Sequence, residues 1–296
     1  NGDIVRLLND ELADSTEFLN WLNESLSLNL SVEGAPTSVH SPNIPVSDLA
    51  VLYVDNSSLK LSHLTFTGFT SPVISGQKCK MELEDITFLD SIATRGAIFS
   101  FMDGELEGNQ LNFTNSTLQT QGAIVVFNGS VNITNSVVNA NFMESQDVRA
   151  LLHFVSSNVS LYDCHITSNV LKLPLIATSN STRAVFDRLE MAHNEVFVLI
   201  GIEFDSSITV KNSVFNNNHG SVIAGGLMSN IDFSDTLITR QVADDAFISL
   251  IDSNLSFART IVNDTRATGG IMIHFNHTTG TLTLRDCLFR KLQFNL

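Results

Sequence analysis

A stretch of about 25 residues recurs roughly ten times along this chain, and the repeat limits the possible folds more than any other feature. Its clearest copy, Ser207–Asn218, reads S-I-T-V-K-N-S-V-F-N-N-N. Ile208 and Val210 alternate with polar neighbours, which indicates a strand with one buried face. The following Asn-Ser pair is typical of a turn, and a second short apolar run comes after it.

The second apolar residue of each such strand gives the period of the repeat. Successive anchors lie 22 to 28 residues apart, and repeats of this length are typical of solenoids, propellers or arrays. The predicted anchors are Leu61, Leu83, Leu106, Ile133, Leu161, Phe186, Val210, Phe233, Phe257 and Leu284.

A further apolar run comes before each anchor, for example A-L-L-H-F-V at 150–155. Two or three short strands per period without a helical pattern fit one coil of a parallel β-helix. A leucine-rich repeat would need a fixed L-x-x-L-x-L framework, and a propeller blade needs about 40 residues. Parallel strand connections favour the right hand. The sequence therefore predicts an all-β, single-stranded, right-handed parallel β-helix of about 10–11 coils with an N-terminal helical cap.

Polar residues recur at two positions of the coil. Two residues after each anchor, seven of ten residues are Asp, Asn or Gly, which tolerate the positive φ of a tight turn. These predicted turn residues are His63, Asp85, Gly108, Asn135, Asp163, Arg188, Asn212, Asp235, Arg259 and Asp286. A second set is predicted to form an inward ladder of amides that satisfies turn backbone: Asn141, Asn169, Asn194 and Asn218.

Short motifs in these coils resemble those of a known group of proteins. G-A-I at 96–98 and 122–124, G-G-I at 269–271 and F-N-N-N at 215–218 are similar to the G-G-A-I and F-x-x-N repeats of bacterial polymorphic outer-membrane proteins. More broadly, the pattern from about residue 49 to 290 resembles the pectin-lyase-like right-handed β-helix superfamily. The resemblance implies the fold and an exposed surface protein, and it transfers no activity.

The first residues depart from the repeat. In 1–27, apolar residues fall at helical spacing and Asp14 with Glu17 forms a capping box. An open β-helix end exposes strand edges and core, so we predict that 1–27 is an amphipathic helical cap. The region 28–296 is predicted to be one β-helix that continues into further chain or stacks on another copy.

Charge excludes two classes of partner. The formal net charge is −15 and the pI is about 4.7, which argues against nucleic acid and against an anionic membrane surface. No run of 18 apolar residues occurs, so no direct membrane insertion of this segment is expected.

Sequons for N-glycosylation are about twice as frequent as chance would give. Twelve occur among 28 Asn residues, and they predict N-linked glycans on a secreted, cell-surface protein. The alternative is that Asn-, Ser- and Thr-rich turns generate sequons freely, as in bacterial β-helices without N-glycans. The candidate sites are Asn23, Asn29, Asn56, Asn112, Asn115, Asn128, Asn132, Asn158, Asn180, Asn254, Asn263 and Asn276.

The three cysteines do not indicate a disulfide framework. Cys164 and Cys287 share a register but lie five coils apart, about 24 Å at strand spacing, far beyond the reach of a disulfide. With Cys79, they are predicted to be buried free thiols that act as small hydrophobic groups.

Catalytic signatures of the superfamily were sought without success. Polygalacturonase-like enzymes carry N-T-D, D-D, G-H-G and R-I-K in that order. Here the only D-D is Asp244-Asp245, and it follows His219-Gly220, so the order is reversed. His274 and His277 lack a third ligand nearby, so no metal site is expected. The sequence predicts no catalytic, cofactor-binding or metal-ligating residues and no cofactor.

These observations lead to an expected function. The chain is predicted to be a non-enzymatic extracellular structural or adhesive β-helix module of a glycosylated surface protein or fibre, able to stack end to end. Its expected partners are N-linked glycans and other copies of itself or other surface proteins. The alternatives are a polysaccharide lyase or hydrolase, tested at Asp244 and Asp245, and a glycan-binding surface receptor with a groove beside the coils.

Overall fold

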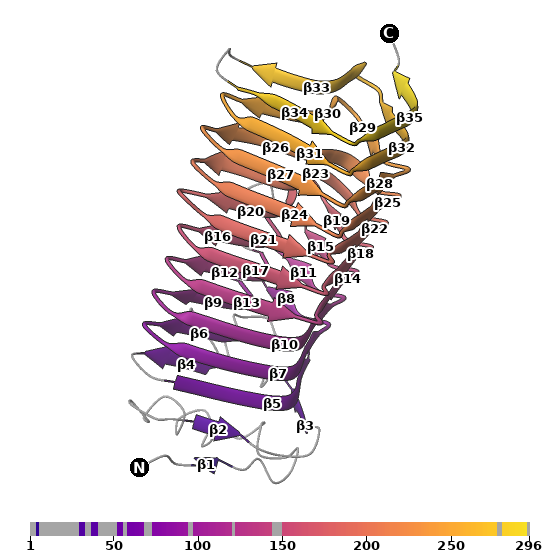
Figure 1. The fold of residues 1–296 in the computed structure, drawn as a ribbon. Coiled ribbons are helices and arrows are strands. Elements are labelled where there is room, and N and C mark those ends of the chain that lie inside the picture. The colour runs from indigo at the N-terminus through magenta and orange to yellow at the C-terminus, as the bar shows by residue number, and fades with distance from the viewer. Residues whose placement is uncertain are drawn as a thin grey trace.

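A computed structural model shows the chain as a stack of about nine coils in one parallel β-solenoid (Figure 1). The structure describes residues 4–5, 30–32, 37–40, 52–55, 58–67, 73–93, 97–119, 122–143, 150–276 and 280–294. Each strand pairs in parallel with its counterpart in the next coil, as β13, β17 and β21 do. The predicted parallel β-helix is therefore confirmed, with about nine coils where about 10–11 were predicted.

Three long sheets run the length of the stack. We name them A, B and C in the order in which the chain passes through them within one coil. Sheet A begins with the first halves of β5 (Ser58–Thr67), β7 (Lys80–Leu89) and β10 (Glu105–Thr114). It continues through β13 (Ser130–Thr134), β17 (Asn158–Tyr162), β21 (Arg183–Asp187), β24 (Ser207–Lys211), β27 (Asn230–Ser234), β31 (Asn254–Ala258) and β34 (Leu282–Arg285).

Sheet B follows after a tight turn and begins with the second halves of β5, β7 and β10. It continues through β14 (Val137–Asn139), β18 (His165–Thr167), β22 (Glu190–Ala192), β25 (Val214–Asn216), β28 (Leu237–Thr239), β32 (Ile261–Ala267) and β35 (Leu288–Phe294). Short strands lie beyond the next turn: β8 (Ile92–Ala93), β11 (Thr117–Leu118), β15 (Phe142–Met143), β19 (Val170–Leu171) and β29 (Val242–Ala243).

Sheet C closes each coil. Its strands are β4 (Leu52–Asp55), β6 (Ile74–Gln77), β9 (Phe99–Met102), β12 (Ile124–Phe127), β16 (Leu152–Val155), β20 (Pro174–Ser179), β23 (Glu195–Phe204), β26 (His219–Leu227), β30 (Ala246–Ile251) and β33 (Ile271–Asn276). Three further strands are β1 (Ile4–Val5), β2 (Leu30–Val32) and β3 (Thr37–His40). The helical cap predicted at 1–27 lies outside the described residues apart from β1.

The strand register confirms nine of the ten predicted anchors and corrects one. Leu83 pairs with Gly108, and Gly108 pairs with Ile133, so Gly108 occupies the anchor position that was assigned to Leu106. A Cβ atom at Gly108 would lie 2.6 Å from a side-chain carbon of Leu111, so Leu111 fills the space that an anchor side chain would need. The periodicity search missed Gly108 because glycine carries no apolar side chain.

The turn between sheets A and B follows the predicted chemistry. Nine of the ten predicted turn residues have positive φ, between 50° and 57°. The exception is again Gly108, and Gln110 with φ 56° makes the turn in that coil. Asn and Asp adopt this left-handed conformation at a lower cost than most residues, which explains their frequency at the position.

Phenylalanine rings stack along the interior. Phe66, Phe88 and Phe113 lie in consecutive coils with ring centroids 5.3 Å and 4.6 Å apart, and Phe233 stacks on Phe257 at 5.1 Å. All five rings are almost completely buried. Burying a side chain of this kind contributes about 1.5–3 kcal/mol to stability, so the ring stack is a principal source of the core's cohesion.

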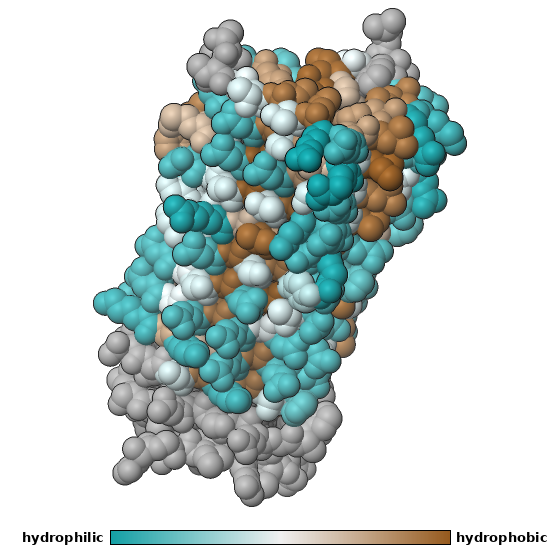
Figure 2. All heavy atoms as spheres, in the orientation of Figure 1, coloured by the Kyte–Doolittle hydropathy of each residue, from teal (hydrophilic) through white to brown (hydrophobic). Residues whose placement is uncertain are grey.

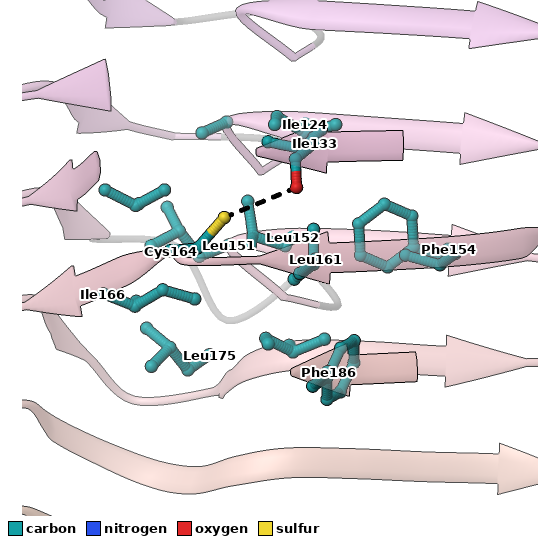
Figure 3. Packing of buried hydrophobic residues seen from close by; sticks show 14 of the residues in the cluster. Ile124, Ile133, Leu151, Leu152, Phe154, Leu161, Cys164, Ile166, Leu175 and Phe186 are labelled. Atoms are coloured by element: carbon teal, nitrogen blue, oxygen red, sulfur yellow. Dashed lines mark hydrogen bonds between the residues drawn. The ribbon is translucent and has the colours of Figure 1, made fainter. Parts of the chain in front are cut away.

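Two of the three cysteines are buried in this interior, as predicted, and the third packs against it from the last described coil. Cys79 and Cys164 are buried free thiols, whereas Cys287 is partly exposed. The Cys164 thiol donates a hydrogen bond to the backbone oxygen of Ile133, with 3.6 Å between sulfur and oxygen (Figure 3). Burial among apolar neighbours raises the pKa of Cys164 to about 11. This thiol is therefore uncharged and unreactive at neutral pH.

Candidate functional site: the outer faces of sheets A and B

The sequon asparagines described by the structure all lie at the surface. Asn115, Asn128, Asn132, Asn158, Asn180, Asn254 and Asn276 are exposed, and Asn112 and Asn263 are partly exposed. Six of the exposed seven lie on the outer face of sheet A or at the corner between sheets C and A: Asn128, Asn132, Asn158, Asn180, Asn254 and Asn276. Asn23, Asn29 and Asn56 lie outside the described residues.

Some of these amide groups already make contacts. Asn115 donates from Nδ2 to an oxygen of Asp90, and Asn254 donates from Nδ2 to Oδ1 of Asn230 at 2.9 Å. N-glycosylation replaces a hydrogen on this nitrogen. A glycan at Asn115 or Asn254 would therefore disturb an existing contact between coils.

The four inward asparagines form a continuous chain of hydrogen bonds. Nδ2 of Asn141, Asn169 and Asn194 donates to Oδ1 of the asparagine in the next coil, each at 3.0 Å. Each Oδ1 also accepts the backbone N–H of the preceding asparagine, at 3.0–3.1 Å. All four are buried, so the amides satisfy backbone groups that the turn leaves without strand partners.

The chain of amides ends at Gln241. This residue is completely buried, and its Nε2 donates to the backbone oxygen of Gly220 at 2.6 Å. Its Oε1 has no hydrogen-bond partner. The longer side chain thus turns away from Asn218 instead of extending the ladder.

A polar groove of about 240 Å³ lies on the outer face of sheet A at its first coils. Three glutamates, Glu82, Glu84 and Glu107, line it together with Lys60, Asn109, Asn132 and Thr134. Lys80 lies 3.3 Å from Glu82, and the hydrogen bond to Glu82 together with the charge of Glu107 raises the pKa of Lys80. Carboxylates grouped in this way can donate and accept protons or bind polar ligands.

A second groove of about 360 Å³ lies at the turn that follows sheet B. It is lined by His193, Glu195, His219 and Arg240 among others. His219 Nε2 lies 2.9 Å from an oxygen of Asp244, and Asp245 is exposed beside it. The structure therefore places the D-D pair singled out from the sequence at an exposed corner, on a different side from the three glutamates.

The outer face of sheet B carries a feature that sequence reasoning missed. Four aliphatic side chains in consecutive coils are 37–46 % exposed and pair with one another across the strands: Val214, Leu237, Ile261 and Leu288. We call this row the aliphatic stripe. Figure 2 shows hydrophobic residues gathered over these strands at the upper right. In the sequence each of these residues sits beside an inward-facing apolar residue, so alternation alone did not reveal which one faced outward.

In the described ranges, no three His, Cys, Asp or Glu side chains group so as to hold a metal ion. Within the same ranges, no helix has the length and apolar character needed to cross a membrane.

The chain is similar to several solved structures. No protein-family model matches the chain, and no curated protein matches it either. Among solved structures, a polygalacturonase from Erwinia carotovora ssp. carotovora aligns over all of this chain and 95 % of its own, with 10 % identity and a TM-score of 0.48. An exopolygalacturonase from Thermotoga maritima aligns over 98 % and 92 %, with 10 % identity and a TM-score of 0.35. PfbA, a surface adhesin of Streptococcus pneumoniae, aligns over 96 % and 88 %, with 9 % identity and a TM-score of 0.34.

These structures are pectin-lyase-like right-handed parallel β-helix proteins, and the likeness concerns the fold. The more specific resemblance to polymorphic outer-membrane repeats stays a prediction. The comparisons contradict the expectation that the chain is not an enzyme, because structures that it resembles are polygalacturonases, which are glycoside hydrolases. At 10 % identity the likeness concerns the fold alone and assigns no activity to this chain.

Proposed function

We propose that this chain is an extracellular β-helix module with a structural or adhesive role, and that sheet A is its glycan-bearing face. One observation carries the proposal. Nine sequon asparagines are described by the structure, and none of them is buried. In a coil whose strands alternate between inward and outward positions, sequons arising by chance would also fall on buried positions.

The test is a site-by-site map of N-glycans on protein isolated from its natural source. Enzymatic removal of glycans in ¹⁸O-labelled water marks each occupied asparagine for mass spectrometry. We expect occupancy at Asn128, Asn132, Asn158 and Asn180, which are exposed. Asn115 and Asn254 are expected to be less occupied because their amides contact neighbouring coils. Unmodified asparagine at every sequon of the native protein would refute the glycoprotein part of the proposal.

A second candidate function rests on the groove lined by Glu82, Glu84 and Glu107. Three carboxylates on one outer face are the kind of group that polysaccharide-cleaving or polysaccharide-binding sites use. Incubation with a panel of acidic and neutral polysaccharides, with release of reducing ends and retention on immobilised glycans as readouts, tests this function. Glu107→Gln and Glu82→Gln should abolish the signal, and Glu203→Gln, an exposed glutamate on sheet C, serves as the matched control.

The two candidate functions require opposite states of one residue, which must carry a glycan in one case and no glycan in the other. Asn132 lines the groove and is also a sequon. A glycan on Asn132 would occupy the space that a polysaccharide chain needs. Occupancy at Asn132 in the native protein therefore supports the glycan-bearing face and excludes the groove as a polysaccharide site.

A further inference from the structure

We propose that two copies of this chain associate side by side and parallel through the aliphatic stripe on sheet B. The stripe consists of Val214, Leu237, Ile261 and Leu288, which stack in direct register over four coils. Contiguous exposed apolar rows with polar borders are typical of protein–protein contacts. The proposal concerns sheet B rather than sheet A, and it requires the sequon residue Asn263, which lies on the same strand as Ile261, to carry no glycan.

Each side of the stripe is bordered by a row of turn residues. The first rim, between sheets A and B, consists of Asn212, Asp235, Arg259 and Asp286. The second rim, at the far end of sheet B, consists of Asn217, Arg240, Asp264 and Lys291. All eight residues have positive φ, so both rims are made of tight turns.

The charges of the two rims complement each other coil by coil. Within one coil the partners are Asn212 and Asn217, then Asp235 and Arg240, then Arg259 and Asp264, then Asp286 and Lys291. A two-fold axis parallel to the stack, lying over the stripe, sets the first rim of one copy against the second rim of the other at the same level. Each of the three charged levels then brings opposite charges together on both sides, which gives six pairs.

The antiparallel alternative is less complementary. It sets each rim against the same rim of the second copy with the order of coils reversed. Asp235 then faces Arg259 and Arg240 faces Asp264, which gives four pairs in total. The charges of Asp286 and Lys291 are left opposite the neutral Asn212 and Asn217. The parallel arrangement is therefore the one that the rims favour.

Neither the stripe nor the charged rim pairs continue below the coil of Val214, where the rims are the neutral Asn212 and Asn217. One coil below Val214, the stripe position is Glu190 and the rim positions are Arg188 and His193. In the parallel arrangement Glu190 would face its own counterpart in the second copy, which places like charges opposite each other. The aliphatic residues and the charged rim pairs therefore end within one coil of each other, as expected for the boundary of one contact surface.

Some rim charges already have partners within the chain. Asp286 lies 3.4 Å from Arg285, and Arg240 donates its Nε to Asn216 at 3.1 Å, so the guanidinium group of Arg240 keeps further N–H donors. Asp235 and Arg259 form a pair within the first rim, and both are exposed. In the parallel arrangement, Arg240 and Asp264 of the second copy would face this pair and extend it into a network of four charges.

The size of the surface sets the strength of the contact. Four coils spaced about 4.8 Å apart, each contributing about five residues with a rise of about 3.3 Å per residue, cover about 300 Å² per copy. Stable dimers usually bury about 1,200–2,000 Å² in total. The association is therefore weak in solution, and it becomes effective where copies are held next to one another on a surface.

Sedimentation velocity over a wide concentration range tests the proposal. We expect the weight-average sedimentation coefficient to rise with concentration in the unmodified chain. Ile261→Asp should weaken the association at least about tenfold, because it places a charge on the two-fold axis. Val185→Asp is the matched control: Val185 is 39 % exposed on the outer face of sheet A, against 38 % for Ile261. An unchanged sedimentation coefficient at all concentrations, or equal effects of the two variants, would overturn the proposal.

Charge exchange and cross-linking test the parallel arrangement. Asp286→Lys should weaken association about fivefold, and adding Lys291→Asp in the same chain should restore it. In a Cys287→Ser background, a short bis-maleimide should join Leu237→Cys to itself and Ile261→Cys to itself. Cross-linking only in mixtures of the two cysteine variants would show the antiparallel arrangement and refute the parallel one. Circular dichroism of each variant verifies that the coils remain folded.

Discussion

Sheets A and B both have apolar interiors but different exteriors. Inside, sheet A presents two buried apolar rows, with Ile208 and Val210 as examples, and sheet B presents one, with Met191 and Phe215. Outside, sheet A carries polar side chains and sequons, whereas the last four coils of sheet B carry the aliphatic stripe. The interior is constrained because neighbouring coils must pack at a fixed spacing. The exterior is free to vary, and for that reason the two outer faces are where function is to be sought.

The largest effects should come from the interior, and they should be equal in the two sheets. Phe186→Ala in sheet A and Phe215→Ala in sheet B each remove a completely buried ring. Each is expected to lower the free energy of unfolding by about 3–5 kcal/mol. Urea denaturation followed by circular dichroism measures both. A much smaller loss of unfolding free energy for one of the two variants would contradict the expectation that both interiors contribute equally.

The amide ladder, which lies where sheet B ends, should be the next most sensitive feature. Asn194→Ala removes the acceptor for two donors of Asn169 and the donor to the backbone oxygen of Ile166. Leaving these buried groups unpaired should cost about 2–4 kcal/mol in the free energy of unfolding. Asn230→Ala, at an exposed position of sheet A, is the control and should change it by less than about 0.5 kcal/mol. Similar losses in both variants would argue against a structural role for the ladder.

The end of the ladder can be extended. Gln241→Asn shortens a side chain whose Oε1 has no partner, and it places an amide where Asn218 can donate to it. The gain in the free energy of unfolding should be about 0.5–1 kcal/mol after the loss of the bond to Gly220. Thermal denaturation of Gln241→Asn beside Gln241→Met provides the measurement. An equal gain in the methionine variant would show that packing, not hydrogen bonding, limits this position.

The smallest expected effect concerns charge on the first rim. The hydrogen bond from Arg259 holds the pKa of Asp235 below its usual value of 3.8. A carboxylate whose pKa is depressed by folding stabilises the protein above its unfolded pKa and loses that effect as the pH falls through the folded pKa. Wild type should therefore exceed Asp235→Asn slightly in melting temperature at pH 5, and the difference should disappear as the pH falls through the lowered pKa of Asp235. Both groups are exposed, so about 1 M salt should also remove the difference; persistence of the difference at low pH would contradict this account.

The sequence predicted the coil well because the period and the turns leave local signals. Alternation placed Ile133, Phe186 and Val210 at the anchor position, and Asn or Asp marked most turns of positive φ. The register failed only at Gly108, where Leu111 from the same coil fills the space above a residue with no side chain. The predicted burial of Cys287 is met in part, since this residue of the last described coil packs against the core but is partly exposed.

The outer faces were less predictable, since their features depend on pairing between coils. In V-F-N at 214–216 both apolar residues fit a strand, and only the register shows that Val214 faces outward. The match between the two rims becomes visible only when the two turn residues of each coil, five positions apart in the sequence, are compared in four successive coils. Neither the groove of Glu82, Glu84 and Glu107 nor the stripe has a contiguous sequence motif.

Hydroxyl-radical footprinting of side chains at increasing protein concentration tests the contrast between the two faces most directly. We predict that oxidation of Leu237, Ile261 and Leu288 slows as the concentration rises, because the stripe becomes covered by the second copy. Oxidation of Val185, which is similarly exposed on sheet A, should stay constant. Oxidation rates that do not change with concentration at any of the four residues, or that fall equally on both faces, would contradict the account.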